Sequence, residues 1–127
     1  MTGVVLDASA VLVFLRREPG ADRVEQQLAR ASITAIDYAE VIQIGIEAGA
    51  CPAAVRNAVD LLQLEVVPFD QDLALIAAEL WPIMREAGLS MTERCSLALA
   101  KQRNQKVLTV ACDWSQLPLG IDIEVIP

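Results

Sequence analysis

The stretch GVVLDASAVLVFL, residues 3–15, decides the fold. Its residues Val4-Val5-Leu6 form a short apolar, largely β-branched run, which predicts a buried strand that ends at Asp7. Ala8 to Arg17 have helical character and end at Pro19-Gly20. A buried strand therefore passes directly into a helix at an aspartate.

The rest of the chain repeats this alternation. Further strands are predicted over residues 32–34, 65–68, 106–109 and 121–125. Further helices are predicted over residues 22–30, 37–48, 52–63, 73–87 and 90–103, with Asp22 and Asp70 as N-caps and a kink or break at Pro82. The alternation predicts an α/β fold with a central parallel sheet covered on both faces. Because no repeat, low-complexity tract or linker is visible, we expect one domain over residues 1–127.

Composition narrows the class of protein. A chain of 127 residues with 54% hydrophobic residues can bury a real core, in which aliphatic side chains predominate because aromatic residues make up only 4%. The cysteines, Cys51, Cys95 and Cys112, are odd in number and form no CxxC pair, so we expect small buried side chains and no disulfide framework. The chain has no histidine, which excludes imidazole catalysis and imidazole metal ligation.

Charge and hydropathy bear on location and partners. The apolar stretch from Gly3 to Leu15 is too short to cross a bilayer and lacks a preceding basic residue, so we expect a cytoplasmic protein with no membrane partner. The net charge of −7 argues against a nucleic-acid binder unless a bound cation supplies positive charge near the substrate.

Four acidic residues lie where functional groups gather in parallel sheets, beyond the carboxyl ends of the strands. They are Asp7, Glu40, Glu93 and Asp113. Each also has an ordinary explanation. Asp7 can cap a helix, Glu40 can belong to a solvated stripe with Asp37, Gln43 and Glu47, Glu93 can complete a capping box with Ser90, and Asp113 can start a turn.

Together these carboxylates would repel one another unless a cation neutralised them. Ligation by oxygen alone suits Mg²⁺ or Mn²⁺ better than zinc. Such ions activate water and stabilise an in-line displacement at phosphorus. One hypothesis for the four acids is therefore that they hold a metal ion that promotes reaction at a phosphodiester.

Four motifs, in matching order and spacing, resemble those of PIN domains over essentially the whole chain. They are VVLDASA at 4–10, ITAIDYAEV at 33–41, GLSMTERCSLA at 88–98 and LTVACDW at 108–114. The resemblance implies a PIN-like three-layer α/β/α fold with a central parallel sheet of about four or five strands. It also implies an endoribonuclease that uses Mg²⁺ or Mn²⁺. In members of the VapC type, it implies a toxin, typically a homodimer, held inactive by a small VapB-type antitoxin.

The resemblance also assigns roles by position. Asp7, Glu40, Glu93 and Asp113 would be catalytic metal ligands, and Ser9, Thr34 and Thr109 would orient carboxylates or water. The candidate contacts to the RNA backbone are Arg16, Arg17, Arg94 and Lys101, each of which is also explained as an ordinary surface charge.

Two departures from the family pattern keep a second hypothesis open. Glu93 stands where the family usually has aspartate, and Ala111 replaces the first of two aspartates in the fourth motif. The alternative is a degenerate PIN domain that binds RNA or a protein partner without cleavage. A third reading, an unrelated phosphate-handling α/β domain, is disfavoured because no DxD follows the first strand and Lys106 begins its strand instead of ending it.

Overall fold

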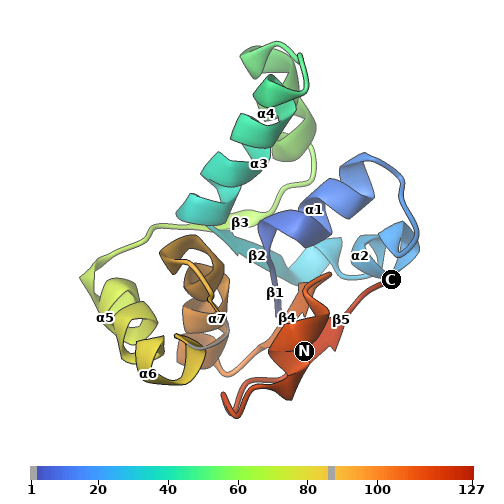
Figure 1. Ribbon diagram of the computed structural model, residues 1–127. Helices are drawn as coiled ribbons and strands as arrows, with labels where there is room; N and C mark the ends of the chain where they lie inside the picture. Colours follow the sequence, from blue (N-terminus) through green and yellow to red (C-terminus); the bar gives the residue numbers. More distant parts are fainter. Residues whose placement is uncertain (1–2, 86–87) are drawn as a thin grey trace.

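The computed structural model describes residues 3–85 and 88–127, apart from the side chain of Cys112. Within this part of the chain, all strands run parallel in one five-stranded sheet of order β3-β2-β1-β4-β5 (Figure 1). The strands are β1 (Val4–Leu6), β2 (Ala31–Thr34), β3 (Glu65–Val67), β4 (Lys106–Thr109) and β5 (Ile123–Val125). The predicted α/β class and the parallel sheet are confirmed.

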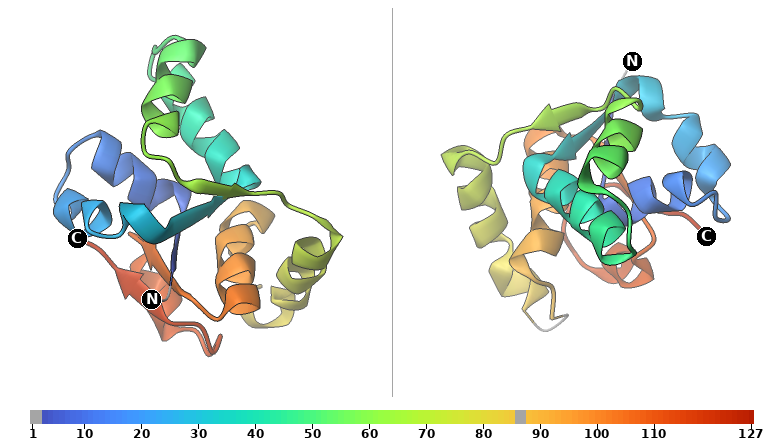
Figure 2. Two further views of the ribbon diagram at one scale, coloured as in Figure 1. Left: turned by 180° about the vertical axis from the view of Figure 1, so that it is seen from behind. Right: turned by 90° about the horizontal axis from the view of Figure 1, so that it is seen from above.

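Helices cover both faces of this sheet. They are α1 (Ala8–Leu15), α2 (Ala21–Glu25), α3 (Ala35–Glu47), α4 (Pro52–Asp60), α5 (Gln71–Glu79), α6 (Trp81–Met84) and α7 (Met91–Arg103), with the 3₁₀ turns η1 (Leu28–Arg30) and η2 (Cys112–Gln116). α5, α6 and α7 pack on one side, α1 and α2 on the other, and α3 and α4 form a pair that projects from the body (Figures 1 and 2).

Strand β1 shows why both faces must be covered. Val4 and Leu6 join a core cluster with α1, α2, α3 and α4, whereas Val5 points into a second cluster with α5 and α7. Successive side chains of a strand point to opposite faces, so a wholly apolar strand needs an apolar layer on each side. The uninterrupted run Val4–Leu6 is therefore a consequence of the three-layer arrangement.

The helix ends agree with the predicted caps in part. Asp70 caps α5 and Ser90 forms a complete capping box with Glu93 at the start of α7, both as predicted. The prediction for Asp22 was wrong, because the N-cap of α2 is Gly20, two residues earlier, whose φ of 101° makes the turn. The helix also ends at Glu25, and a 3₁₀ turn follows. The break expected at Pro82 is present as the boundary between α5 and α6, after Glu79.

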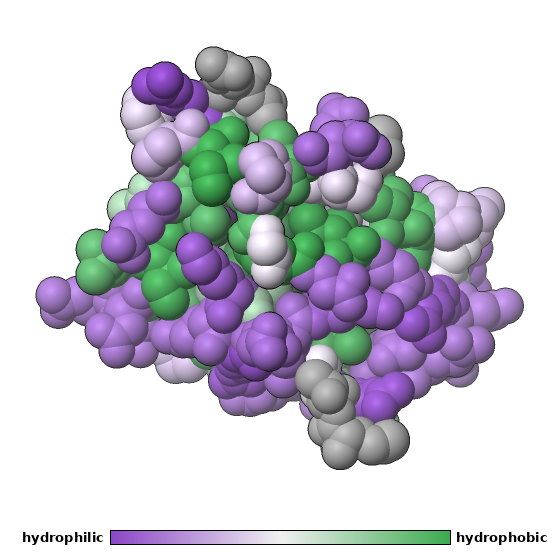
Figure 3. Space-filling model, turned by 90° about the horizontal axis from the view of Figure 1, so that it is seen from below, coloured by the Kyte–Doolittle hydropathy of each residue, from purple (hydrophilic) through white to green (hydrophobic). Residues whose placement is uncertain are grey.

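The cysteine prediction holds in part. Cys95 is buried, whereas Cys51 is exposed in the loop before α4. The side chain of Cys112 lies outside the described part of the structure. In the described residues, no helix combines the length and hydropathy that a bilayer span requires. Viewed from below, the surface carries a broad hydrophilic band beside hydrophobic patches (Figure 3).

The contact between α3 and α4 yields a stability prediction. A Cβ added at Gly45 would lie 2.7 Å and 2.8 Å from the two γ-methyl carbons of Val55. Alanine is favoured over glycine in a helix by about 1 kcal/mol, but overpacking against a stiff valine costs ~1–3 kcal/mol. We expect Gly45→Ala to lower the free energy of unfolding by about 1 kcal/mol in urea denaturation.

A double-mutant cycle separates the two effects. In a Val55→Ala background the clash is gone, so Gly45→Ala should raise the free energy of unfolding by up to about 1 kcal/mol through helix propensity. The same sign of effect in both backgrounds would contradict the close packing of these helices.

Candidate metal-binding carboxylate site

The candidate site lies at the carboxyl edge of the sheet. The chain passes from β1 to β2 and β3 on one side and then returns to place β4 on the other side of β1. This reversal makes a topological switch point, where ligands of open parallel sheets bind. Asp7 directly follows β1, and Thr109 is the last residue of β4. The topology therefore brings these two residues together although about a hundred positions separate them.

Asp7 is buried, and three hydrogen-bond donors from the first turn of α1 and the end of β4 hold its carboxylate. Its Oδ1 accepts from the Ser9 hydroxyl at 2.6 Å and from the Ala10 amide at 2.9 Å, and its Oδ2 accepts from the Thr109 hydroxyl at 2.6 Å. Burial raises the pKa of Asp7, and the hydrogen bonds from Ser9 and Thr109 oppose that rise. Asp7 is thus both the N-cap of α1 and a preoriented carboxylate.

Asp37 belongs to the same site, and sequence reasoning missed it. The sequence pattern predicts that Asp37 lies in a solvated stripe, but only 2% of its surface is exposed. Its Oδ1 accepts from the Ala8 amide at 3.2 Å and its Oδ2 from the Thr34 hydroxyl at 2.7 Å. Burial, followed by the charges of Asp7 and Glu40, raises the pKa of Asp37 to about 7.

A sequence signal for Asp37 exists. Thr34 is the N-cap of α3, three residues before the predicted start of this helix, and it accepts from the Asp37 amide. Thr34-x-x-Asp37 is therefore the capping pattern of a serine or threonine followed three residues later by an acid. Of the predicted stripe, Gln43 and Glu47 do lie on the exposed surface.

Glu40 lies one helical turn beyond Asp37 and is half-buried. Burial raises its pKa, and the charges of Asp7 and Glu93 raise it further. Because such charge effects fall off with distance, Asp7, Glu40 and Glu93 share one electrostatic environment. These three sequence-predicted residues are brought together from β1, α3 and α7.

Glu93 has a second task at the start of α7. Its Oε1 accepts from the Ser90 amide and from the Ser90 hydroxyl, each at 3.2 Å. The capping reading of Glu93 is therefore confirmed, and it coexists with the charge coupling to Glu40. Only Oε2 of Glu93 lacks a hydrogen bond among the described residues.

The structure does not bring Asp113, Arg16, Arg17 or Lys101 into this group of carboxylates. Asp113 is exposed in η2, and it is not among the charges that raise the pKa of Asp37 or Glu40. Arg16 and Arg17 are exposed beyond the end of α1. Lys101 lies near the other end of α7, at the opposite edge of the sheet.

The explanation of Arg94 as an ordinary surface charge is wrong, because only 7% of its surface is exposed. Its Nε is buried without a hydrogen-bond partner among the described residues.

The donor set fits a hard divalent cation. A carboxylate oxygen has two acceptor positions, so Asp7 Oδ2, both oxygens of Glu40 and Glu93 Oε2 retain capacity for a metal. Within the described residues, however, no three acids or cysteines already stand together as a ligand set. The site therefore offers oxygen donors and like charges that raise one another's pKa, and side-chain rotation would have to complete the coordination.

Comparison with known proteins agrees with this architecture. The family model described as "PIN domain" matches residues 4–117. DNA-bound VapBC from Salmonella typhimurium is similar in structure with a TM-score of 0.76 and 21% identity, over 98% of each chain. VapC20 of Mycobacterium tuberculosis, described as a toxin that cleaves the sarcin–ricin loop, has a TM-score of 0.74 and 18% identity over 98% of this chain and 100% of its own.

One further structure has higher identity. VapBC-5 from Mycobacterium tuberculosis, a member of a family of toxin–antitoxin systems, has a TM-score of 0.63 and 26% identity over 99% of this chain and 98% of its own. None of the curated proteins matches the chain.

Proposed function

Because the chain belongs to the PIN domain family, we propose that it is a metal-dependent endoribonuclease of the VapC type, the toxin of a toxin–antitoxin pair. The observation that supports this proposal is the convergence of Asp7, Asp37, Glu40 and Glu93 on one edge of the sheet. The charges of Asp7 and Glu40 raise the pKa of Asp37, and those of Asp7 and Glu93 raise the pKa of Glu40. A bound cation is the simplest balance.

Each residue has a role that follows from its contacts. Asp7, Glu40 and Glu93 would hold Mg²⁺ or Mn²⁺ through their remaining oxygen positions, with Asp113 approaching from η2. When bound, the ion would activate water and stabilise charge on a phosphodiester. Ser9 and Thr109 orient Asp7, and Thr34 orients Asp37, so the carboxylates are preorganised before any ion arrives.

Asp37 would have two roles, which are to position the other carboxylates and to exchange a proton. Its hydrogen bond from the Ala8 amide ties the start of α1 to the start of α3, which keeps Asp7 and Glu40 in register. Since its pKa is about 7, it can accept or release a proton near neutral pH.

The direct test is cleavage of a structured RNA by the purified protein. We expect cleavage with Mg²⁺ or Mn²⁺ and none after addition of a chelator. Cleavage that survives the chelator would overturn the metal-dependent mechanism.

The double task of Glu93 leads to a prediction. Glu93→Gln keeps the Oε1 acceptor of the capping box but removes the charge, so stability should stay within about 0.5 kcal/mol while Mn²⁺ affinity falls by about tenfold. Isothermal titration with Mn²⁺ measures the affinity, and Glu79→Gln, exposed on α5, is the control. Unchanged affinity would reduce Glu93 to a helix cap.

The occupied oxygen of Glu93 also favours the second candidate, a degenerate PIN domain that binds RNA or a protein partner without cleavage. Absence of Mn²⁺ binding by the folded wild-type protein would support this candidate over the nuclease.

We extend the proposal to partners and location. A VapB-type antitoxin and a second copy of the chain would bind apolar surface, and Leu61, Leu75 and Trp81 are 81%, 60% and 49% exposed on the helical layers. The protein would act on RNA in the cytoplasm. Size-exclusion chromatography with light scattering would measure the oligomeric state.

A further inference from the structure

A basic cavity lies at the edge of the sheet opposite the carboxylates. It has a volume of about 550 Å³ and is bounded by the start of β1, the start of β4 and the end of α7. Four of the ten basic residues of the chain line it, namely Arg23, Arg30, Lys101 and Lys106. In a protein with a net charge of −7, this concentration of positive charge is a marked local exception.

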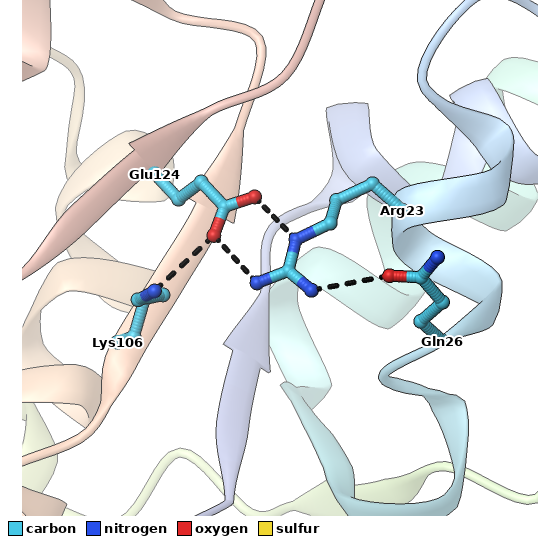
Figure 4. A network of polar contacts seen from close by, with 4 residues as sticks. All are labelled: Arg23, Gln26, Lys106 and Glu124. Atoms are coloured by element: carbon cyan, nitrogen blue, oxygen red, sulfur yellow. Dashed lines mark hydrogen bonds and ion pairs between the residues drawn. The ribbon is translucent and has the colours of Figure 1, made fainter.

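Two of these cations are held in place by one acid. Glu124 accepts from Arg23 Nε at 2.5 Å, from a terminal nitrogen of Arg23 at 2.8 Å and from Lys106 Nζ at 3.2 Å (Figure 4). Among the described residues, the acid that lines the cavity itself is Asp122. Even with Glu124 counted beside the lining, four basic residues accompany two acids, so the formal charge around the cavity is positive. Lys101 forms no ion pair with any residue in the described part of the chain.

Amide side chains also line the cavity. Gln27 is buried, with 4% of its surface exposed, and it lines the cavity together with Gln105. Gln105 packs against the start of β1, where a Cβ on Gly3 would lie 2.9 Å from its amide nitrogen. Its Oε1 is buried without a partner among the described residues, so rotation of this amide toward a ligand donor would satisfy it.

We infer that this cavity binds a nucleoside phosphate, with the phosphate against the basic residues and the base or ribose against the amides of Gln27 and Gln105. The volume lies within the range of small-molecule sites, and guanidinium and ammonium groups are the usual partners of phosphate. The inference goes beyond the proposed nuclease activity and does not require it, because binding here involves none of the carboxylates. The shared chemistry is a nucleoside phosphate, and the experiment below distinguishes a free nucleotide from a nucleotide within an RNA strand.

The probe is 5′-AMP, titrated by NMR in buffer with a chelator so that no metal contributes. We expect saturable binding with a Kd at or below about 1 mM for wild type and at least about tenfold weaker binding for Lys101→Glu. Arg56→Glu, exposed on the distant α4, is the matched charge control and should bind as wild type does. Asp7→Asn should also bind 5′-AMP normally, which separates this site from the nuclease site.

A six-nucleotide RNA with hydroxyl ends distinguishes the two sources. Displacement of 5′-AMP by this RNA assigns the site to phosphates within a strand, and retention of 5′-AMP assigns it to free nucleotides. The inference is overturned if 5′-AMP shows no saturable binding, or if Asp7→Asn abolishes binding while Lys101→Glu leaves it intact.

Discussion

Asp7→Asn should reduce RNA cleavage by at least about 100-fold while leaving the protein folded. Asparagine is as good an N-cap as aspartate, so the bond from the Ala10 amide and the start of α1 should persist. What the substitution removes is a buried negative charge that Ser9 and Thr109 orient toward the site. Stability without metal should therefore be unchanged or slightly higher, whereas cleavage and Mn²⁺ binding should be lost.

The chain offers a matched control in Asp70→Asn. Asp70 also follows a strand and also caps a helix, accepting from the Leu73 amide at 3.0 Å, but it lies at the start of α5. We expect Asp70→Asn to cleave RNA at the wild-type rate. Equal cleavage by wild type and Asp7→Asn would refute the catalytic role of the carboxylate site.

The second large effect is a loss of stability with rising pH in the absence of divalent ions. Asp37 has a pKa of about 7 in the folded protein against 3.8 for the ordinary group, so the folded state retains a proton that the unfolded state has released. The contribution of Asp37 to the free energy of unfolding is fully present below pH 3.8 and is lost as the pH rises through the folded-state pKa of about 7. The difference corresponds to at most about 4 kcal/mol.

Other ionisable groups also determine the pH range in which the protein is most stable. Burial also raises the pKa of Asp7 and Glu40, which adds to the decline in the same direction. Glu124 acts oppositely, because the Arg23 guanidinium lowers its pKa to about 2, and its contribution is lost only as the pH falls below about 4.5. The free energy of unfolding should therefore be greatest near pH 4–5, which urea denaturation at intervals from pH 3 to 8 would measure.

A substitution and an added ion test why the free energy of unfolding declines as the pH rises. Asp37→Asn should flatten the curve between pH 5 and 8, and Mn²⁺ at 100 times its Kd should raise the free energy of unfolding at pH 7 by about 2.7 kcal/mol. Sodium chloride at matched ionic strength is the control for screening. A flat wild-type curve, or an equal slope in Asp37→Asn, would contradict the burial of an uncompensated carboxyl.

The sequence by itself determined the α/β class, the parallel sheet and the capping roles of Asp70 and Ser90. These features depend on short-range pattern, since alternation of strands and helices and the chemistry of caps are readable within a few residues. The same local reasoning failed at Asp22, because the N-cap is Gly20, whose positive φ begins the helix two residues earlier than the acid suggests.

Only the tertiary structure decided which acids belong together. Asp37 and Glu47 share a helix and a polar stripe, yet Asp37 is buried while Glu47 is exposed. The reason is that the first turn of α3 lies against the start of α1, where Asp37 accepts from the Ala8 amide, and Glu47 lies at the far end of the helix. The basic cavity likewise unites the start of β1 with the end of α7 and the start of β4, which lie about a hundred positions later in the chain. Periodicity tells which residues share a face, but the distance between faces is set by the order of strands in the sheet.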